Sequence, residues 1–327
     1  MGSTTGKSMN AGWLVSPAFD LLFFANLPVF LLLLPLSNTN PVEFIQIYFL
    51  TVPHRWLTLF LVAFDADRRE GREKAIIGLP LLFAAVVVAV LASSRNLTCL
   101  LLIDYIWNGW HFASQHAGLL AVYSRRCGDT GRHRLERHGT RFLVCYVVLR
   151  TAGWSTGWME TLPIARLGLS ITDGLTLGIA ALLVLRCMLA RPLPVAKCWY
   201  MASVAGVYSG LLAGLILDNK WLIGSFAAAG AFFHAAEYVA LVGYYGWRKG
   251  LHEPGGMVPA VARQWVVLVI LFCLIMGGVS SLVQSGQQMP MWWMALNVWA
   301  ALLHYAYDGM IWRLRKPSTA AALGAGE

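Results

Sequence analysis

The sequence predicts an all-α membrane protein, a polytopic bundle of about ten transmembrane helices. Hydrophobic residues make up 58% of the 327 residues and charged residues only 13%, whereas soluble domains average about 45–50% and about 25%. Apolar stretches of about 20 residues, each long enough to cross a bilayer as a helix, recur from end to end. This composition excludes a soluble enzyme, a disordered chain and a disulfide scaffold. We expect one transmembrane domain covering residues 1–327, with short loops.

Ten apolar segments can be marked, and turn-forming residues separate several of them. Examples are the turns at 37–41, 191–194 and 253–256, which contain Pro, Gly, Asn or Ser. Small-residue runs at 206–214 and 224–230 predict close contacts between helices. Numbered as spans 1 to 10, the segments cover residues 18–36, 43–64, 75–93, 97–124, 141–162, 168–190, 195–216, 219–246, 262–284 and 290–312.

The distribution of Lys and Arg predicts the orientation of the spans. With both termini in the cytoplasm, all but five of the 25 basic residues fall on the cytoplasmic side. The exceptions are Arg95, Arg166 and Lys220 in outside loops and Arg55 and Arg150 within spans. This asymmetry is typical of ten spans with cytoplasmic termini, in a bacterial inner membrane. It also explains the net charge of +9 without a nucleic-acid partner.

The even-numbered spans carry nearly all of the ionisable residues within the membrane. Such residues are energetically costly in lipid and indicate a functional site. Counting back from the basic inner end of each span, at about 1.5 Å per residue, places them roughly 10–20 Å from the inner boundary. Four parallel helices would therefore bring them to one level in the cytoplasmic half of the bilayer. The residues are His54 in span 2, His111 and His116 in span 4, His234 and Glu237 in span 8, and His304 and Asp308 in span 10.

These residue types predict a metal site. Imidazole suits iron, copper and zinc, and added carboxylates favour iron or manganese over copper. We expect one or two non-haem irons, because five histidines and two carboxylates exceed the about four to six donors that one metal needs. His116 lies about 140° around the helix from His111, so it joins the site only through a π-bulge or a metal between two faces. The expected ligands are His54, His111, His234 and His304, with His116, Glu237 and Asp308 as further ligands, supporting groups or, for the two carboxylates, catalytic groups.

Further polar residues are candidates for supporting the ligands or binding a substrate. Thr58, Gln115 and Tyr238 could fix the imidazole tautomers, and Gln115 and Tyr238 could also contact substrate. Arg150 lies near the depth of the histidines. It could bind an acidic substrate head group, but pairing with Asp104, Asp65 or Glu237 is favoured because an unpaired buried charge is costly.

The order and rough spacing of these motifs give the chain a distant resemblance to the bacterial Brp/Blh-type β-carotene-cleaving dioxygenases. The resemblance implies a polytopic helical membrane fold, an iron held by histidines on separate helices, and O₂ as co-substrate. Carried over to this chain, it implies that His54, His111, His234 and His304 bind the iron. The motifs that carry it are Pro53-His54, His111-Phe112, His234, and His304 followed by Asp308 and Arg313.

The expected function is O₂-dependent oxidation of a long apolar substrate, such as a lipid or isoprenoid, that enters from the bilayer. A site in the cytoplasmic half would lie near cellular reductants, and a separate electron donor could supply reducing equivalents. Three alternatives stay open. They are a zinc-dependent lipid hydrolase with Glu237 or Asp308 as general base, a bis-histidine haem protein that transfers electrons, and a transporter that uses the ionisable residues as a proton or metal relay.

Overall fold

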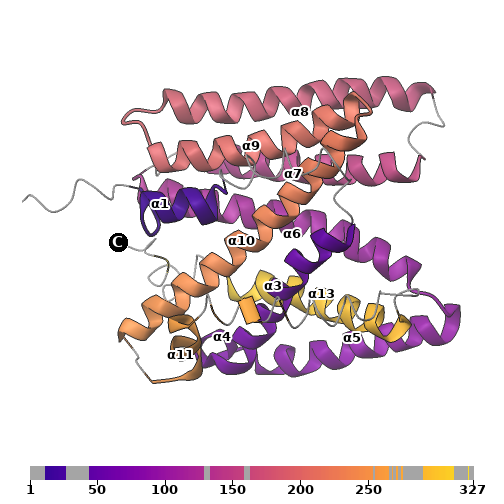
Figure 1. Cartoon of the computed structure of the whole chain (residues 1–327), viewed down its shortest axis with the longest axis vertical. Coiled ribbons are helices and arrows are strands. Elements are labelled where there is room, and N and C mark those ends of the chain that lie inside the picture. The colour runs from indigo at the N-terminus through magenta and orange to yellow at the C-terminus, as the bar shows by residue number, and fades with distance from the viewer. Residues whose placement is uncertain are drawn as a thin grey trace, which may run out of the picture. The chain divides into compact units, whose positions relative to one another are not determined.

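The structure, a computed structural model, consists of helices joined by loops (Figure 1). No strand occurs among the residues that it describes, and this confirms the predicted all-α class. The described residues are 12–26, 44–128, 133–157, 163–252, 255–264 and 290–312, together with 267, 270, 271, 274 and 323.

The helices group into two compact units. The first comprises Met1–Glu43, Gly109–Glu237 and Glu327, and the second comprises Phe44–Asn108 and Tyr238–Gly326. Two long helices, α6 (Thr98–Arg126) and α10 (Lys220–His252), each contribute residues to both units without a break in the helix. The expectation of one domain over residues 1–327 stays a prediction.

The first unit is built around three helices that pack against one another, α7, α8 and α9. Its N-terminal segment begins with a capped turn, in which the Ser16 hydroxyl accepts a hydrogen bond from the backbone of Phe19 at 3.2 Å. Asp20 anchors this segment by accepting a hydrogen bond from Tyr123 of α6 at 2.9 Å. The elements of this unit, besides its parts of α6 and α10, are α1 (Pro17–Phe19), the π-helix η1 (Asp20–Phe24), α7 (His133–Thr156), α8 (Pro163–Leu189) and α9 (Val195–Ile216).

In the second unit, the last long helix, α13, packs against α3 and α5. Asp65 separates α3 from α4 and caps α4, because its carboxylate accepts from the backbone of Asp67 at 3.1 Å. The same carboxylate is buried and accepts from Tyr245 at 2.6 Å and from Lys249 at 2.7 Å. The further elements of this unit are α3 (Phe44–Phe64), α4 (Ala66–Arg69), α5 (Glu73–Ser94), α11 (Met257–Arg263) and α13 (Met291–Ile311).

Four of the described helices are long and apolar enough to cross a membrane, so the chain is consistent with an integral membrane protein. Eight predicted segments coincide largely with described helices, whereas 18–36 and 262–284 lie largely outside the described residues. The number of ten spans and the cytoplasmic termini stay predictions. The four apolar stretches are Glu73–Ser94, Leu167–Leu189, Val195–Ile216 and Lys220–Leu251.

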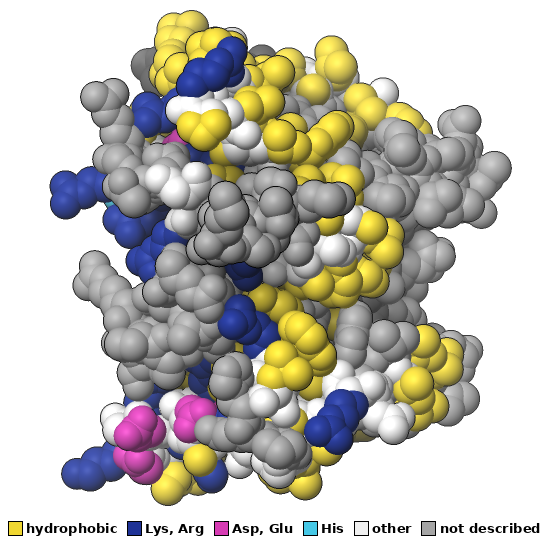
Figure 2. Space-filling view, turned by 90° about the vertical axis from the view of Figure 1, so that its left-hand side faces the viewer, with side chains coloured by type: hydrophobic (Ala, Val, Ile, Leu, Met, Phe, Trp, Pro, Cys, Tyr) yellow, Lys and Arg dark blue, Asp and Glu magenta, His cyan; other side chains and the backbone are white. Residues whose placement is uncertain are grey.

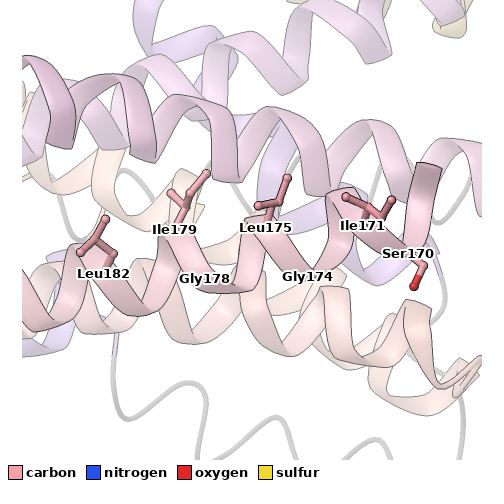
Figure 3. A pocket seen from close by; sticks show the side chains of 7 residues that line it. All are labelled: Ser170, Ile171, Gly174, Leu175, Gly178, Ile179 and Leu182. Atoms are coloured by element: carbon pink, nitrogen blue, oxygen red, sulfur yellow. The ribbon is translucent and has the colours of Figure 1, made fainter. Parts of the chain in front are cut away.

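Large apolar side chains lie on the outside of several helices. On α5, Ile77 is 67% exposed and Leu81 is 68% exposed. Hydrophobic side chains also form patches on the face shown in Figure 2, and α8 presents a shallow, mostly apolar groove between Ser170 and Leu182 (Figure 3). Exposure of this kind is unfavourable in water but costs little against lipid tails, which supports a membrane environment.

Candidate metal centre

Four buried histidines, each from a different helix, form a group that could hold a metal ion. One potential ligand atom from each imidazole lies within 4.8 Å of the other three. The exposed fractions of these side chains are at most 8%. The four residues are His54 on α3, His111 on α6, His234 on α10 and His304 on α13.

One potential ligand nitrogen from each of the four imidazoles belongs to a group that could hold one metal ion. Metal–nitrogen bonds of about 2.0–2.1 Å keep any two ligand nitrogens within about 4 Å of each other. The four ligand atoms lie within 4.8 Å of one another, which is close to this spacing. Within the second unit, the rings of His54 and His304 meet edge to face with centroids 4.8 Å apart. Within the first unit, His111 and His234 do the same at 4.8 Å.

In the second unit, hydroxyl and carboxylate groups surround His304. The Thr58 hydroxyl lies 2.7 Å from His304 Nδ1 and also contacts Asp308 Oδ1 at 3.0 Å. Tyr238 donates to Asp308 Oδ1 at 2.7 Å and forms a very short hydrogen bond with Thr58. Thr58 and Tyr238, predicted as supporting residues, therefore lie directly beside one of the four histidines.

In the first unit, two residues of α6 contact His234. Phe112 stacks on the His234 ring with centroids 4.0 Å apart. The Gln115 amide donates to the backbone carbonyl of His234 and to Glu237 Oε2, both at 2.9 Å. Because both acceptors are oxygens, these contacts fix which way the amide of Gln115 points. They link α6 to the turn of α10 that carries the histidine.

His116 lies outside the four-histidine group. Its Nδ1 is 3.1 Å from Glu237 Oε1 and 3.1 Å from the Tyr200 hydroxyl, and its Nε2 is 3.2 Å from the Tyr208 hydroxyl. The helix α6 is α-helical over Thr98–Arg126, so the π-bulge that could turn His116 toward His111 does not form. Both ring nitrogens are occupied by hydrogen bonds, and the regular helix keeps His116 about 140° around from His111.

The two predicted carboxylates also lie outside the group. Glu237 is completely buried and binds His116 and Gln115, whereas Asp308 is buried and binds Thr58 and Tyr238. Each carboxylate is thus held one helical turn from a histidine of the group, His234 or His304. Their expected roles as direct ligands or catalytic groups stay predictions.

Arg150 is paired, as expected, but with a residue that the sequence analysis did not name. Its Nε lies 3.6 Å from Asp173 on α8, and the same carboxylate accepts from Tyr146 at 2.5 Å. Sequence reasoning also missed Tyr200 and Tyr208. These two tyrosines are eight residues apart on α9 and so lie close to one helix face, a pattern that would have suggested a shared neighbour without identifying it.

No protein-family model, curated protein or solved structure matches this chain. The resemblance to the Brp/Blh-type dioxygenases therefore stays an expectation. The case for a metal centre rests on the convergence of four buried histidines from α3, α6, α10 and α13.

Proposed function

We propose that this chain is a membrane-embedded metalloenzyme that holds one non-haem iron on His54, His111, His234 and His304 and oxidises a long apolar substrate with O₂. The observation that carries the proposal is the convergence of four buried imidazoles to within 4.8 Å in a chain with apolar, membrane-length helices. Imidazole nitrogens are common ligands of iron and zinc, and four of them brought together could bind one metal ion.

The environment of the histidines suits reactive oxygen chemistry. When bound, iron would supply the redox chemistry of O₂ activation, with electrons from a separate donor. The protein would exclude water, because all four histidines are buried. Asp308 and Glu237 lie in hydrogen-bonded networks beside His304 and His234, where a carboxylate oxygen of either could take up a proton. A lipid or isoprenoid, including a carotenoid, could reach such a site directly from the bilayer.

The spacing of the four nitrogens weighs against a bis-histidine haem. A porphyrin would have to pass between two axial ligands, yet the other two histidines lie within 4.8 Å of both. Zinc fits the same four donors, so a zinc-dependent lipid hydrolase is distinguished from the iron enzyme only by the metal that is bound. A transporter would use the same histidines without retaining a metal stoichiometrically.

The first test is elemental analysis and a visible spectrum of the protein purified gently in detergent. We expect about one iron per chain, because four imidazoles saturate one metal's usual set of about four to six donors, and no Soret band. The double variant His234→Ala/His304→Ala should lose the metal. The matched control is His138→Ala on α7, which changes an exposed histidine and should retain the iron.

Other results would redirect the proposal. Stoichiometric zinc in a colourless protein would favour the hydrolase, and a Soret band would identify haem. Wild-type protein with no metal would contradict the metal centre itself. If iron is present, O₂ uptake with lipid and carotenoid substrates tests the reaction, and uptake that is the same in wild type and double variant would count against it.

The variant His116→Gln separates the four-histidine site from the larger ligand set predicted from sequence. Because both nitrogens of His116 bind other side chains, the variant should keep the wild-type metal content. Loss of half the metal would instead indicate a second metal bound through His116.

A further inference from the structure

Thr58, Tyr238 and Asp308 form a buried triangle of hydrogen-bonded oxygens beside His304. At most 8% of any of these side chains is exposed. Thr58 Oγ1 contacts Tyr238 Oη in a very short hydrogen bond and Asp308 Oδ1 at 3.0 Å, and Tyr238 Oη contacts the same Asp308 oxygen at 2.7 Å. A fourth contact leaves the triangle, from Thr58 Oγ1 to His304 Nδ1 at 2.7 Å.

The number of available hydrogens determines the direction of that fourth contact. The Thr58 and Tyr238 hydroxyls carry one hydrogen each, while the triangle contains three oxygen–oxygen contacts. If Asp308 is ionised, only the two hydroxyl hydrogens are available for the three oxygen–oxygen contacts. If Asp308 is protonated, its own hydrogen brings the number to three, one for each contact. In neither state is a hydroxyl hydrogen left over for the imidazole.

If Thr58 donated its hydrogen to His304, one more oxygen–oxygen contact of the triangle would therefore lack a hydrogen. With Asp308 ionised, two of the three close oxygen–oxygen contacts would then have no hydrogen between the two oxygens. At least one of these repulsive contacts would involve the carboxylate. The second Asp308 oxygen, Oδ2, also lies 3.7 Å from His304 Nδ1, and in the ionised state of Asp308 its charge favours a hydrogen on that nitrogen. Both observations point to an imidazole that donates.

We infer that Thr58 is a positioning residue: it accepts a hydrogen bond from His304 Nδ1 and so holds this histidine in the tautomer whose Nε2 lone pair is available to a metal. Asp308 supports this role by accepting the hydroxyl hydrogen of Thr58. The inference rests on the proposed function only in assigning His304 as a ligand. Its hydrogen-bond content applies to the metal-free protein as well.

The test is the tautomer of His304, measured by ¹⁵N NMR on metal-free protein with labelled histidine in lipid. The variant His304→Ala identifies the signal. We expect the Nδ1–H form in wild type. Thr58→Val, which keeps the shape of the side chain but removes its hydroxyl, should shift the signal toward the Nε2–H form. Thr58→Ser restores the hydroxyl and should restore the wild-type tautomer.

The matched control is Tyr238→Phe. It removes one corner of the triangle but leaves Thr58 free to donate to Asp308 and accept from His304, so the tautomer should not change. A His304 signal in the Nε2–H form in wild type, or a tautomer that is the same in Thr58→Val, would overturn the inference. If Thr58→Val does not fold, an Nε2–H form in Thr58→Ser or in Tyr238→Phe would overturn it equally.

Metal affinity gives a second readout, measured by anaerobic titration with Fe²⁺ against a chelator. Thr58→Val should bind Fe²⁺ about 10–100-fold more weakly, as is usual when the partner of a ligating histidine is lost, and Thr58→Ser should recover most of the affinity. Equal affinities would contradict the positioning role. If no variant and no wild-type protein binds metal, the proposed function fails, while the tautomer result still decides the inference about Thr58.

Discussion

Pro80 interrupts the hydrogen bonding of α5, and Tyr307 of α13 compensates for it. Proline has no backbone N–H, so the carbonyl of Ile76 loses its helical donor. The Tyr307 hydroxyl donates to this carbonyl at 2.8 Å, and Trp299 Nε1 donates to the carbonyl of Pro80 at 3.0 Å. Because lipid offers no donors, such a replacement has a large effect on stability in a membrane protein.

The compensation predicts coupling between Tyr307 and Pro80. Tyr307→Phe should reduce the free energy of unfolding by about 1–3 kcal/mol, the usual effect of leaving a buried acceptor unsatisfied. In a Pro80→Ala background the loss should be smaller, because the alanine N–H can bind the Ile76 carbonyl. Unfolding in detergent, measured for all four proteins of this double-mutant cycle, checks the coupling. An equal effect of Tyr307→Phe in both backgrounds would show that the two residues act independently.

At the scale of helices, glycines on α9 permit its close packing against α10. A Cβ atom added at Gly210 would overlap the ring of Phe226, and one at Gly214 would lie 3.0 Å from the backbone of Ile223. The small residues in the runs 206–214 and 224–230 predict close contacts between helices. The contacts are confirmed at Gly210 and Gly214, whereas Gly206 and Gly224 have open space beside them.

This difference predicts opposite effects of one substitution at neighbouring turns of α9. Gly210→Ala should destabilise the protein by about 1–3 kcal/mol, because an overpacked contact forces side chains to shift. Gly206→Ala should instead be neutral or stabilising by up to about 1 kcal/mol, since alanine favours the helix and meets nothing there. Thermal unfolding of both variants in the same detergent checks this, and equal melting temperatures would contradict the packing argument.

At the scale of the whole molecule, the charge distribution predicts which loops face the cytoplasm. Exposed Glu70, before α5, lies in a segment with Arg68, Arg69 and Arg72, whereas exposed Asn96, after α5, adjoins only Arg95. The positive-inside rule places the first segment in the cytoplasm and the second outside.

Cysteine labelling tests this orientation. In a background with the exposed Cys99 changed to serine, Asn96→Cys should react with a membrane-impermeant maleimide in intact cells. Glu70→Cys should react only after permeabilisation, because the bilayer separates it from the reagent. The reverse pattern would invert the predicted topology and place the four histidines in the outer half of the membrane.

Helix limits illustrate how far hydropathy predicts structure. The segment 195–216 coincides with α9, but α10 continues to His252, six residues past the predicted end at 246. Similarly, α7 begins at His133 rather than at 141. Hydropathy reports which residues suit lipid, whereas a helix extends as long as its backbone hydrogen bonds continue, including through charged residues such as Arg248 and Lys249.

The sequence by itself determined the helical, apolar character of the chain and the presence of ionisable residues within its apolar segments, because both follow from composition and from periodicity within one helix. Only the tertiary structure decided that four histidines converge while His116 binds Glu237 and two tyrosines, and that Thr58 lies against His304. Those contacts join residues 57 to 250 positions apart in the chain, from His54 with His111 to His54 with His304. They depend on the rotation and packing of separate helices, which no pattern within a single helix specifies.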